Sequence, residues 1–150
     1  MVKWILTIFL LMISMSSLHA SCEELKSDCE YYSCVEEQRH CGDKGYLIGF
    51  GKKYCMKFSS DEDYFSDEGK EWIQKVRECL IKNLDLPSID MSCKKFKRAQ
   101  IKSHVPCYME SGYCELSRSD RYAVKKVIFK SMWRPSLVWA GIKVIASCRF

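Results

Sequence analysis

The chain has 150 residues, of which 47% are hydrophobic, 29% are charged and 13% are aromatic, and its formal net charge is +5. This composition is typical of a folded globular domain and excludes a disordered or collagen-like chain. Ten cysteines are far more than a protein in a reducing compartment needs, so we expect a disulfide framework made in an oxidising compartment.

The N-terminus predicts export. Lys3 precedes an almost unbroken apolar run over residues 4–15. A bilayer needs about 20 apolar residues to be spanned, so the run is too short for a transmembrane helix and suits the hydrophobic region of a signal peptide. We therefore expect a signal peptide over residues 1–20 and one mature domain over residues 21–150. We expect this domain to be secreted, and so to be extracellular or, in a bacterium, periplasmic.

A lipoprotein signal is the alternative interpretation of this segment, with Cys22 as the acylated residue. His19 stands where such signals carry an aliphatic side chain, and acylation would remove one cysteine from an even set of ten. No other apolar run is long enough to span a membrane, so we expect no transmembrane segment.

Charge is unevenly distributed along the mature chain. Residues 21–90 have a net charge of −6, whereas residues 91–150 have a net charge of +10. Two halves that face and neutralise each other would produce this distribution, and so would a basic surface that binds a polyanion. Both interpretations stay open from the sequence.

The first part of the mature chain has two different characters. Over residues 22–41, cysteine and apolar positions repeat at helical spacing from Cys22 to Tyr32. Residues 42–58 then interleave four glycines with aromatic residues. We expect this second segment to form a loop or a tight strand-like turn that returns the chain to Cys55.

An acidic segment over residues 59–68 precedes the clearest helix of the chain. Ser66 is a good N-cap, because its hydroxyl can accept a hydrogen bond from the exposed N–H groups of the first turn. We expect the helix over residues 69–84, stopped by Pro87. Its apolar stripe is formed by Trp72, Ile73, Val76, Cys79, Leu80 and Leu84.

A second helix is expected after a cap at Ser88 or Asp90, with Pro106 as its end. One face carries Cys93, Phe96, Gln100 and His104. The other face carries five cations that we single out as candidate binding residues, namely Lys94, Lys95, Lys97, Arg98 and Lys102.

The C-terminal part predicts two more helices. Residues 107–116 read as a short turn or helix, and Ser119 is expected to cap a helix that runs to about Met132. Pro135 is well placed to open the last helix. With little strand signal, the predicted fold is mainly α, a small disulfide-rich helical domain with a glycine- and aromatic-rich loop near its N-terminus.

Helix geometry removes some of the cysteine pairings. Bridged Cα atoms lie within about 7 Å, whereas residues seven apart on one helix are separated by about 10 Å. If the segments are helical, three pairs are therefore disfavoured: Cys22–Cys29, Cys34–Cys41 and Cys107–Cys114.

The sequence resembles the stanniocalcin family at four motifs. They are the run Gly-Lys-Glu-Trp-Ile from Gly69 that leads to Cys79-Leu80, then Cys93-x-x-Phe96, Cys107-Tyr108 and Cys114-x-Leu116. The resemblance covers Cys22 to Cys148, and all ten cysteines have counterparts in the family.

The resemblance implies a secreted, mainly helical, non-enzymatic protein. Members of this family act as hormone-like regulators of calcium and phosphate and inhibit pappalysin metalloproteases. The family's additional cysteine, which links two subunits, has no counterpart here, so a monomer is expected. The implied disulfide pairing is Cys22–Cys34, Cys29–Cys55, Cys41–Cys93, Cys79–Cys107 and Cys114–Cys148.

This pairing has a consequence for local structure. Cys22 and Cys34 would lie about 18 Å apart on a continuous helix, which is too far for a disulfide. The resemblance therefore implies that the chain bends between them, near residues 29–33.

No catalytic, cofactor-binding or metal-ligating residue stands out, and we expect no enzymatic activity. A phospholipase A2 would need a His-Asp pair and a glycine-rich calcium loop, but neither His40 nor His104 is followed by Asp. A zinc site at His40 is disfavoured, because disulfides would consume the neighbouring thiolates.

Two functions are therefore favoured over that of a small secreted hydrolase. The first is a secreted regulatory protein on a stanniocalcin-like core that binds an extracellular protein. The alternative is a secreted or envelope-associated protein that binds a polyanion through its basic second half, using the five cations named above.

Overall fold

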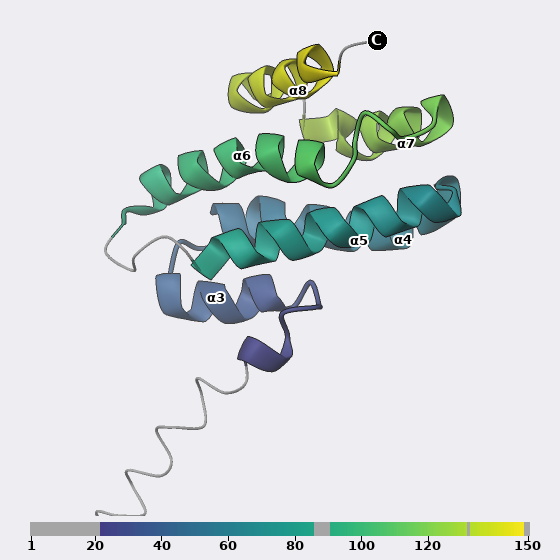
Figure 1. Cartoon of the computed structure of the whole chain (residues 1–150). Helices are drawn as coiled ribbons and strands as arrows, with labels where there is room; N and C mark the ends of the chain where they lie inside the picture. Colours follow the sequence, from purple (N-terminus) through teal and green to yellow (C-terminus); the bar gives the residue numbers. More distant parts are fainter. Residues whose placement is uncertain (1–21, 86–90, 132, 149–150) are drawn as a thin grey trace, which may run out of the picture.

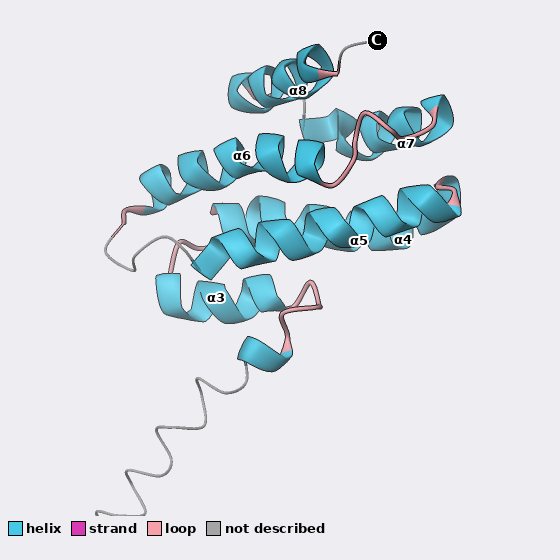
Figure 2. Ribbon diagram, viewed as in Figure 1, coloured by secondary structure: helices cyan, strands magenta, loops and turns pink. Residues whose placement is uncertain are grey.

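The computed structural model describes residues 22–85, 91–131 and 133–148, and every regular element in these ranges is helical (Figure 2). The mainly α prediction is therefore confirmed. The expected signal peptide and the caps expected at Ser88 and Asp90 lie outside the described residues. No helix in the described ranges is long and apolar enough to cross a membrane.

The helices stack in layers across the molecule (Figure 1). From the N-terminal side, α3 packs against the π-helix η1, α4 contacts α7, α5 packs on α6, and α8 covers α6 at the opposite end of the stack. The main elements are α3 (Tyr31–Arg39), η1 (Leu47–Lys52), α4 (Lys53–Ser60), α5 (Asp67–Lys82), α6 (Cys93–Glu110), α7 (Arg118–Ile128) and α8 (Pro135–Ser147).

The chain bends before α3, slightly earlier than the resemblance implies. A helical turn at Cys22 is followed by turns over residues 25–30, and only then does α3 begin. The bend brings Cys22 and Cys34 to a Cα separation of 5.7 Å, within reach of a disulfide.

The prediction of a loop over residues 42–58 is wrong for most of this segment. A short turn ends by Gly45, with His40 and Gly42 at positive φ, and the chain is helical from Tyr46 onward through η1 and α4. Helical spacing buries Tyr46 and Phe50 in the same cluster, so aromatic packing outweighs the poor helix propensity of the glycines.

Gly51 fits this packing because it lacks a side chain. A Cβ atom at this position would overlap the ring of Tyr32 from α3. The glycine therefore allows the backbone of η1 to lie directly against an aromatic ring.

α5 forms as expected and lies at the centre of the molecule. Ser66 Oγ accepts a hydrogen bond from Gly69 N at 3.2 Å, which confirms the N-cap. Trp72 and Val76 are buried and Lys75 is exposed, whereas Lys70, which the stripe would also place in solvent, is half-buried.

α6 does not end at Pro106 but continues to Glu110, which corrects the sequence-based boundary. An internal proline costs a helix about 3 kcal/mol. Two disulfides offset this cost, because Cys93 bridges to Cys41 at the start of α6 and the buried Cys107 bridges to Cys79 just beyond the proline.

The caps of the last two helices differ from the expectation in one position. Ser117, and not Ser119, caps α7, since its hydroxyl accepts from Asp120 N at 3.0 Å. α7 ends at Ile128 and a 3-10 turn, η4 (Phe129–Ser131), follows. Pro135 opens α8, as expected.

The structure pairs the ten cysteines as the stanniocalcin resemblance implies, and none of them is free. Their Cα separations lie between 5.3 and 5.7 Å, which is the ordinary range for a disulfide. The bridges are Cys22–Cys34, Cys29–Cys55, Cys41–Cys93, Cys79–Cys107 and Cys114–Cys148.

Candidate functional site

The five candidate cations all lie on the outward side of α6. Lys97 is half-buried and the other four side chains, those of Lys94, Lys95, Arg98 and Lys102, are exposed. The inward side is held by Phe96, which is fully buried, and by Gln100, whose amide donates to the Asn83 carbonyl at 3.3 Å. The rotation of α6 about its axis is thus set by packing, and this rotation directs the cations to solvent.

No ion pair among the described residues neutralises this cluster. In the described ranges, none of the five cations forms an ion pair with a carboxylate. Within the acidic segment over residues 59–68, Asp61 lies 4.0 Å from Lys57 on α4 and not beside α6. The positive charges of α6 therefore remain available to an external group.

A groove of about 400 Å³ runs between α6 and α8 and gathers part of the cluster. Arg98 and Lys102 line it from α6, and Lys143 and Trp139 line it from α8. The Nζ atom of Lys143 lies 5.1 Å from the centre of the Trp139 ring, within cation–π range. The other three cations of the cluster, Lys94, Lys95 and Lys97, are not among the residues that line this groove.

Lys143 and Trp139 are residues of the candidate groove that the sequence did not indicate. The sequence predicts only the start of the last helix, at Pro135, and no binding residue on it. The outer face of this helix was readable as Trp139, Ile142, Lys143 and Ala146 at helical spacing. Its proximity to α6, however, depends on the packing of two helices that are distant in sequence.

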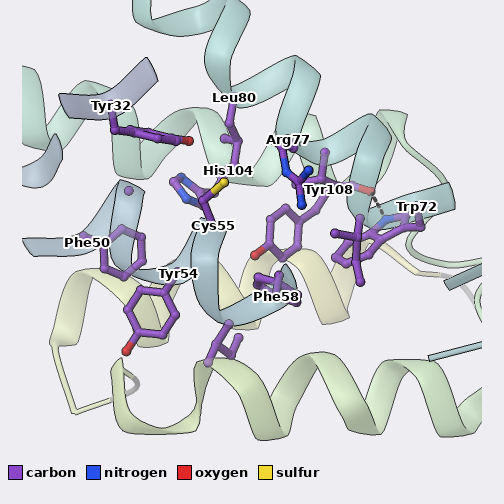
Figure 3. A pocket seen from close by; sticks show the side chains of 14 residues that line it. Tyr32, Phe50, Tyr54, Cys55, Phe58, Trp72, Arg77, Leu80, His104 and Tyr108 are labelled. Carbon is purple, nitrogen blue, oxygen red and sulfur yellow. Dashed lines mark hydrogen bonds between the residues drawn. The ribbon is translucent and has the colours of Figure 1, made fainter. Parts of the chain in front are cut away.

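A second hollow lies in the interior between α4, α5 and α6, and aromatic rings form most of its walls (Figure 3). Its volume is about 50 Å³. Trp72 donates its indole N–H to the Tyr108 carbonyl at 3.4 Å, and the two rings meet edge to face. Other aromatic residues that line it are Tyr32, Phe50, Tyr54 and Phe58.

The polar groups of this hollow are held by the protein itself. His104 Nδ1 lies 2.7 Å from the Gln100 carbonyl, so this nitrogen carries the proton, and Arg77 donates to Ser59 Oγ at 2.8 Å. Burial lowers the pKa of His104 to about 4, although its hydrogen bond acts in the opposite direction. Burial also raises the pKa of Tyr108 above its ordinary range.

This arrangement does not resemble an acid–base site. At neutral pH His104 and Tyr108 are uncharged, and Cys55 at the wall is bonded to Cys29. Within the described parts of the chain, no group of three or more His, Cys, Asp or Glu side chains is arranged to hold a metal ion. The hollow is best described as part of the packed interior, and the groove between α6 and α8 is the candidate binding site.

Comparison of the chain with family models, with curated proteins and with solved structures finds no match. The fold and the site therefore define only a class, a small disulfide-rich helical domain with a basic groove on its surface.

Proposed function

We propose that the chain is a secreted, non-enzymatic binding protein with a regulatory role, built on a stanniocalcin-like disulfide core. The observation that carries the proposal is the pairing of all ten cysteines over Cys22–Cys148, which agrees with the scheme of that family. Ten cysteines allow many other pairings, and the pairing in the structure is the one that the resemblance implies. A hormone-like or protease-inhibitory role is the form that the resemblance favours.

Export and oxidation test the first part of this proposal. The full chain is expressed in a host with an oxidising secretory route, and the protein in the medium is examined by N-terminal sequencing and non-reducing peptide mapping. We expect an N-terminus at Ser21 and a peptide joining Cys41 to Cys93. Retention of the protein in the cell, or Cys41 bonded to another cysteine, would contradict the proposal.

Inhibition tests the regulatory role that the resemblance favours. The oxidised protein is added in excess to a pappalysin-type metalloprotease, and cleavage of a protein substrate is followed over time. We expect slower cleavage, with no effect of the reduced and alkylated chain. Unchanged cleavage would exclude protease inhibition. The binding function would then depend on the basic surface of α6, which is described next.

A second candidate function is supported by the exposed cations of α6, namely binding of a negatively charged partner. The five side chains carry like charges at short spacing, which weakens a helix slightly and gives no benefit to folding. The absence of ion pairs to described carboxylates leaves them free to contact a polyanion or an acidic protein surface.

Heparin affinity across a salt series tests this second function. The native protein is compared with a variant that has Gln at the five positions, Lys94, Lys95, Lys97, Arg98 and Lys102. A control variant with the same net charge has Gln at five lysines outside α6, namely Lys44, Lys53, Lys70, Lys75 and Lys82. We expect the affinity of the first variant to fall by about tenfold or more, because charge-driven binding depends on the number of contacting cations. Equal elution of the three proteins would dispose of the idea.

A further inference from the structure

α8 is apolar on both its inner and its outer side. Leu137 and Val144 are buried against the rest of the molecule. On the outside, Trp139, Ile142 and Ile145 are 60%, 51% and 48% exposed, and we call these three residues the α8 ridge. Large apolar side chains that gather on one exposed face mark an interaction surface.

Two basic grooves flank the α8 ridge. On the α6 side, Arg98, Lys102 and Lys143 line the groove beside Trp139 described above. On the α7 side, a hollow of about 320 Å³ beside Ile145 has three cations in its lining, Arg118, Arg121 and Lys125. Neither lining includes an Asp or Glu among the described residues.

The composition of this end of the chain agrees with the geometry. Residues 121–150 contain seven Lys and Arg and no Asp or Glu. Phe129 and Trp133, in the connection between α7 and α8, are also strongly exposed. α8 is the outermost helix of the stack, and no described element covers its outer face (Figure 1).

We propose that the α8 ridge and its two basic grooves dock on the surface of an anionic lipid bilayer. The inference rests on the proposed binding of a negatively charged partner and names lipid as that partner. Trp139, Ile142 and Ile145 enter the boundary between headgroups and acyl chains, a depth that Trp favours. The flanking cations other than Arg121, whose guanidinium donates to the Cys114 carbonyl at 3.3 Å, contact lipid phosphates, where each Lys or Arg adds to the attraction of an anionic membrane.

The other occupants fit the observations less well. A soluble polyanion would be held by the grooves alone and would leave the α8 ridge in water. A second copy of the chain would place two strongly positive faces against each other, which charge repulsion opposes. A bilayer fits both the cations and the α8 ridge. Its negative headgroups can contact the cations, and its apolar layer lies close enough below them for the ridge side chains to reach.

Vesicle flotation tests the inference with the oxidised protein recovered from the medium of the secreting host. It is mixed with vesicles of phosphatidylcholine alone or of phosphatidylcholine and phosphatidylglycerol. The ridge variant is Trp139→Ser with Ile142→Ser. The control variant is Tyr64→Ser with Met56→Ser, which removes an aromatic and an aliphatic side chain of matching exposure, 56% and 51%, from outside this face. Circular dichroism confirms that both variants are folded.

We expect the native protein and the control variant to float with the anionic vesicles, and to bind neutral vesicles at least about tenfold more weakly. The ridge variant should lose about tenfold or more in binding, because two apolar side chains no longer leave water. Equal binding of the ridge and control variants, or equal binding to both vesicle types, would overturn the inference.

Heparin affinity, measured in parallel, separates the two levels of the proposal. Retention on heparin without any flotation would overturn lipid docking and leave the anion-binding function standing. Absence of both would overturn both. Heparin or a soluble acidic protein is also added as a competitor to the flotation assay. If the competitor abolishes flotation of the native protein and of the ridge variant equally, charge alone causes binding, and the role of the ridge is overturned.

Discussion

At the scale of single residues, Asp120 joins the starts of two helices. It is buried, and its carboxylate accepts from Ser66 N and Ser66 Oγ, both at 2.9 Å, and from Ser117 Oγ at 2.6 Å. Ser66 caps α5 and Ser117 caps α7. Burial alone would raise the pKa of Asp120, but these hydrogen bonds outweigh it and lower the pKa.

Gly69 lies beside this carboxylate, and its substitution has a predictable sign. A Cβ atom at Gly69 would lie 2.6 Å from Asp120 Oδ1. Gly→Ala inside a helix normally stabilises by about 1 kcal/mol. Here we expect Gly69→Ala to destabilise by about 1–3 kcal/mol, because the carboxylate must move from its donors. Urea denaturation measures the free energy of unfolding.

The control for this substitution is a double-mutant cycle. With Asp120→Ala the obstructing oxygen is gone, so Gly69→Ala should cost less than about 0.5 kcal/mol or stabilise the protein. Stabilisation by Gly69→Ala in the native background would contradict the role given to Asp120.

His104 predicts how stability depends on pH. Its pKa is about 4 in the folded protein, against 6.5 for an ordinary histidine, so the unfolded chain binds the proton more readily. Stability is therefore fully present above about pH 6.5 and falls as the pH drops through 4, by about 3 kcal/mol in all.

Urea denaturation between pH 7 and pH 5 measures this effect, in a window above the lowered pKa of Asp120. His104→Leu removes the titrating group and should flatten the curve over this window. The same pH dependence in that variant would assign the effect to other residues.

At the scale of elements, α5 organises the interior, since it contributes to both apolar clusters of the molecule. Trp72 and Leu80 belong to the cluster shared with α7 and α8, whereas Ile81 belongs to the cluster shared with α3, η1 and α6. Trp72 meets the rings of Tyr108 and Tyr113 at centroid distances of 5.1 and 5.8 Å.

Trp72→Ala should therefore cost about 3–5 kcal/mol of stability, as large aromatic residues in cores do. Its neighbour Gln74 is exposed on the same helix, and Gln74→Ala should change stability by less than about 0.5 kcal/mol. Chemical denaturation of the two variants gives the comparison. If Trp72→Ala lowers the free energy of unfolding by less than about 1 kcal/mol, the ring does not contribute to the core as expected.

At the scale of the whole molecule, the disulfides fall into two groups. The Cys79–Cys107 bridge joins α5 to α6, and the Cys114–Cys148 bridge joins the turn after α6 to the end of α8. The remaining three hold the N-terminal segments to each other and to the start of α6.

Reduction of the bridges should unfold the protein. Each disulfide contributes typically about 2–4 kcal/mol, so five together match or exceed the usual 5–15 kcal/mol stability of a domain. We expect the helical circular dichroism signal to collapse when a thiol reductant is added at neutral pH, and to remain in the same buffer without it. A reduced and alkylated chain that keeps the signal would show that packing alone holds the fold.

Local sequence patterns were sufficient for much of the fold. The stripe through Trp72 and Val76, the cap at Ser66 and the start of α8 at Pro135 all depend on residues within one or two turns of each other. Hydrogen bonds at a helix terminus and the burial of one helical face are short-range effects, so a single sequence displays them. The even number of cysteines likewise indicated a closed set of bridges.

Contacts between distant segments decided the rest. Tyr46 to Ser60 is helical because aromatic rings from three elements meet there, and α6 passes Pro106 because bridges hold it on both sides. The candidate site has the same origin, since Lys143 lies more than 40 residues from Arg98 and joins it only when α8 packs on α6. The free energy of such contacts depends on which surfaces pack together in the folded chain, and the local periodicity of the sequence does not show which surfaces these are.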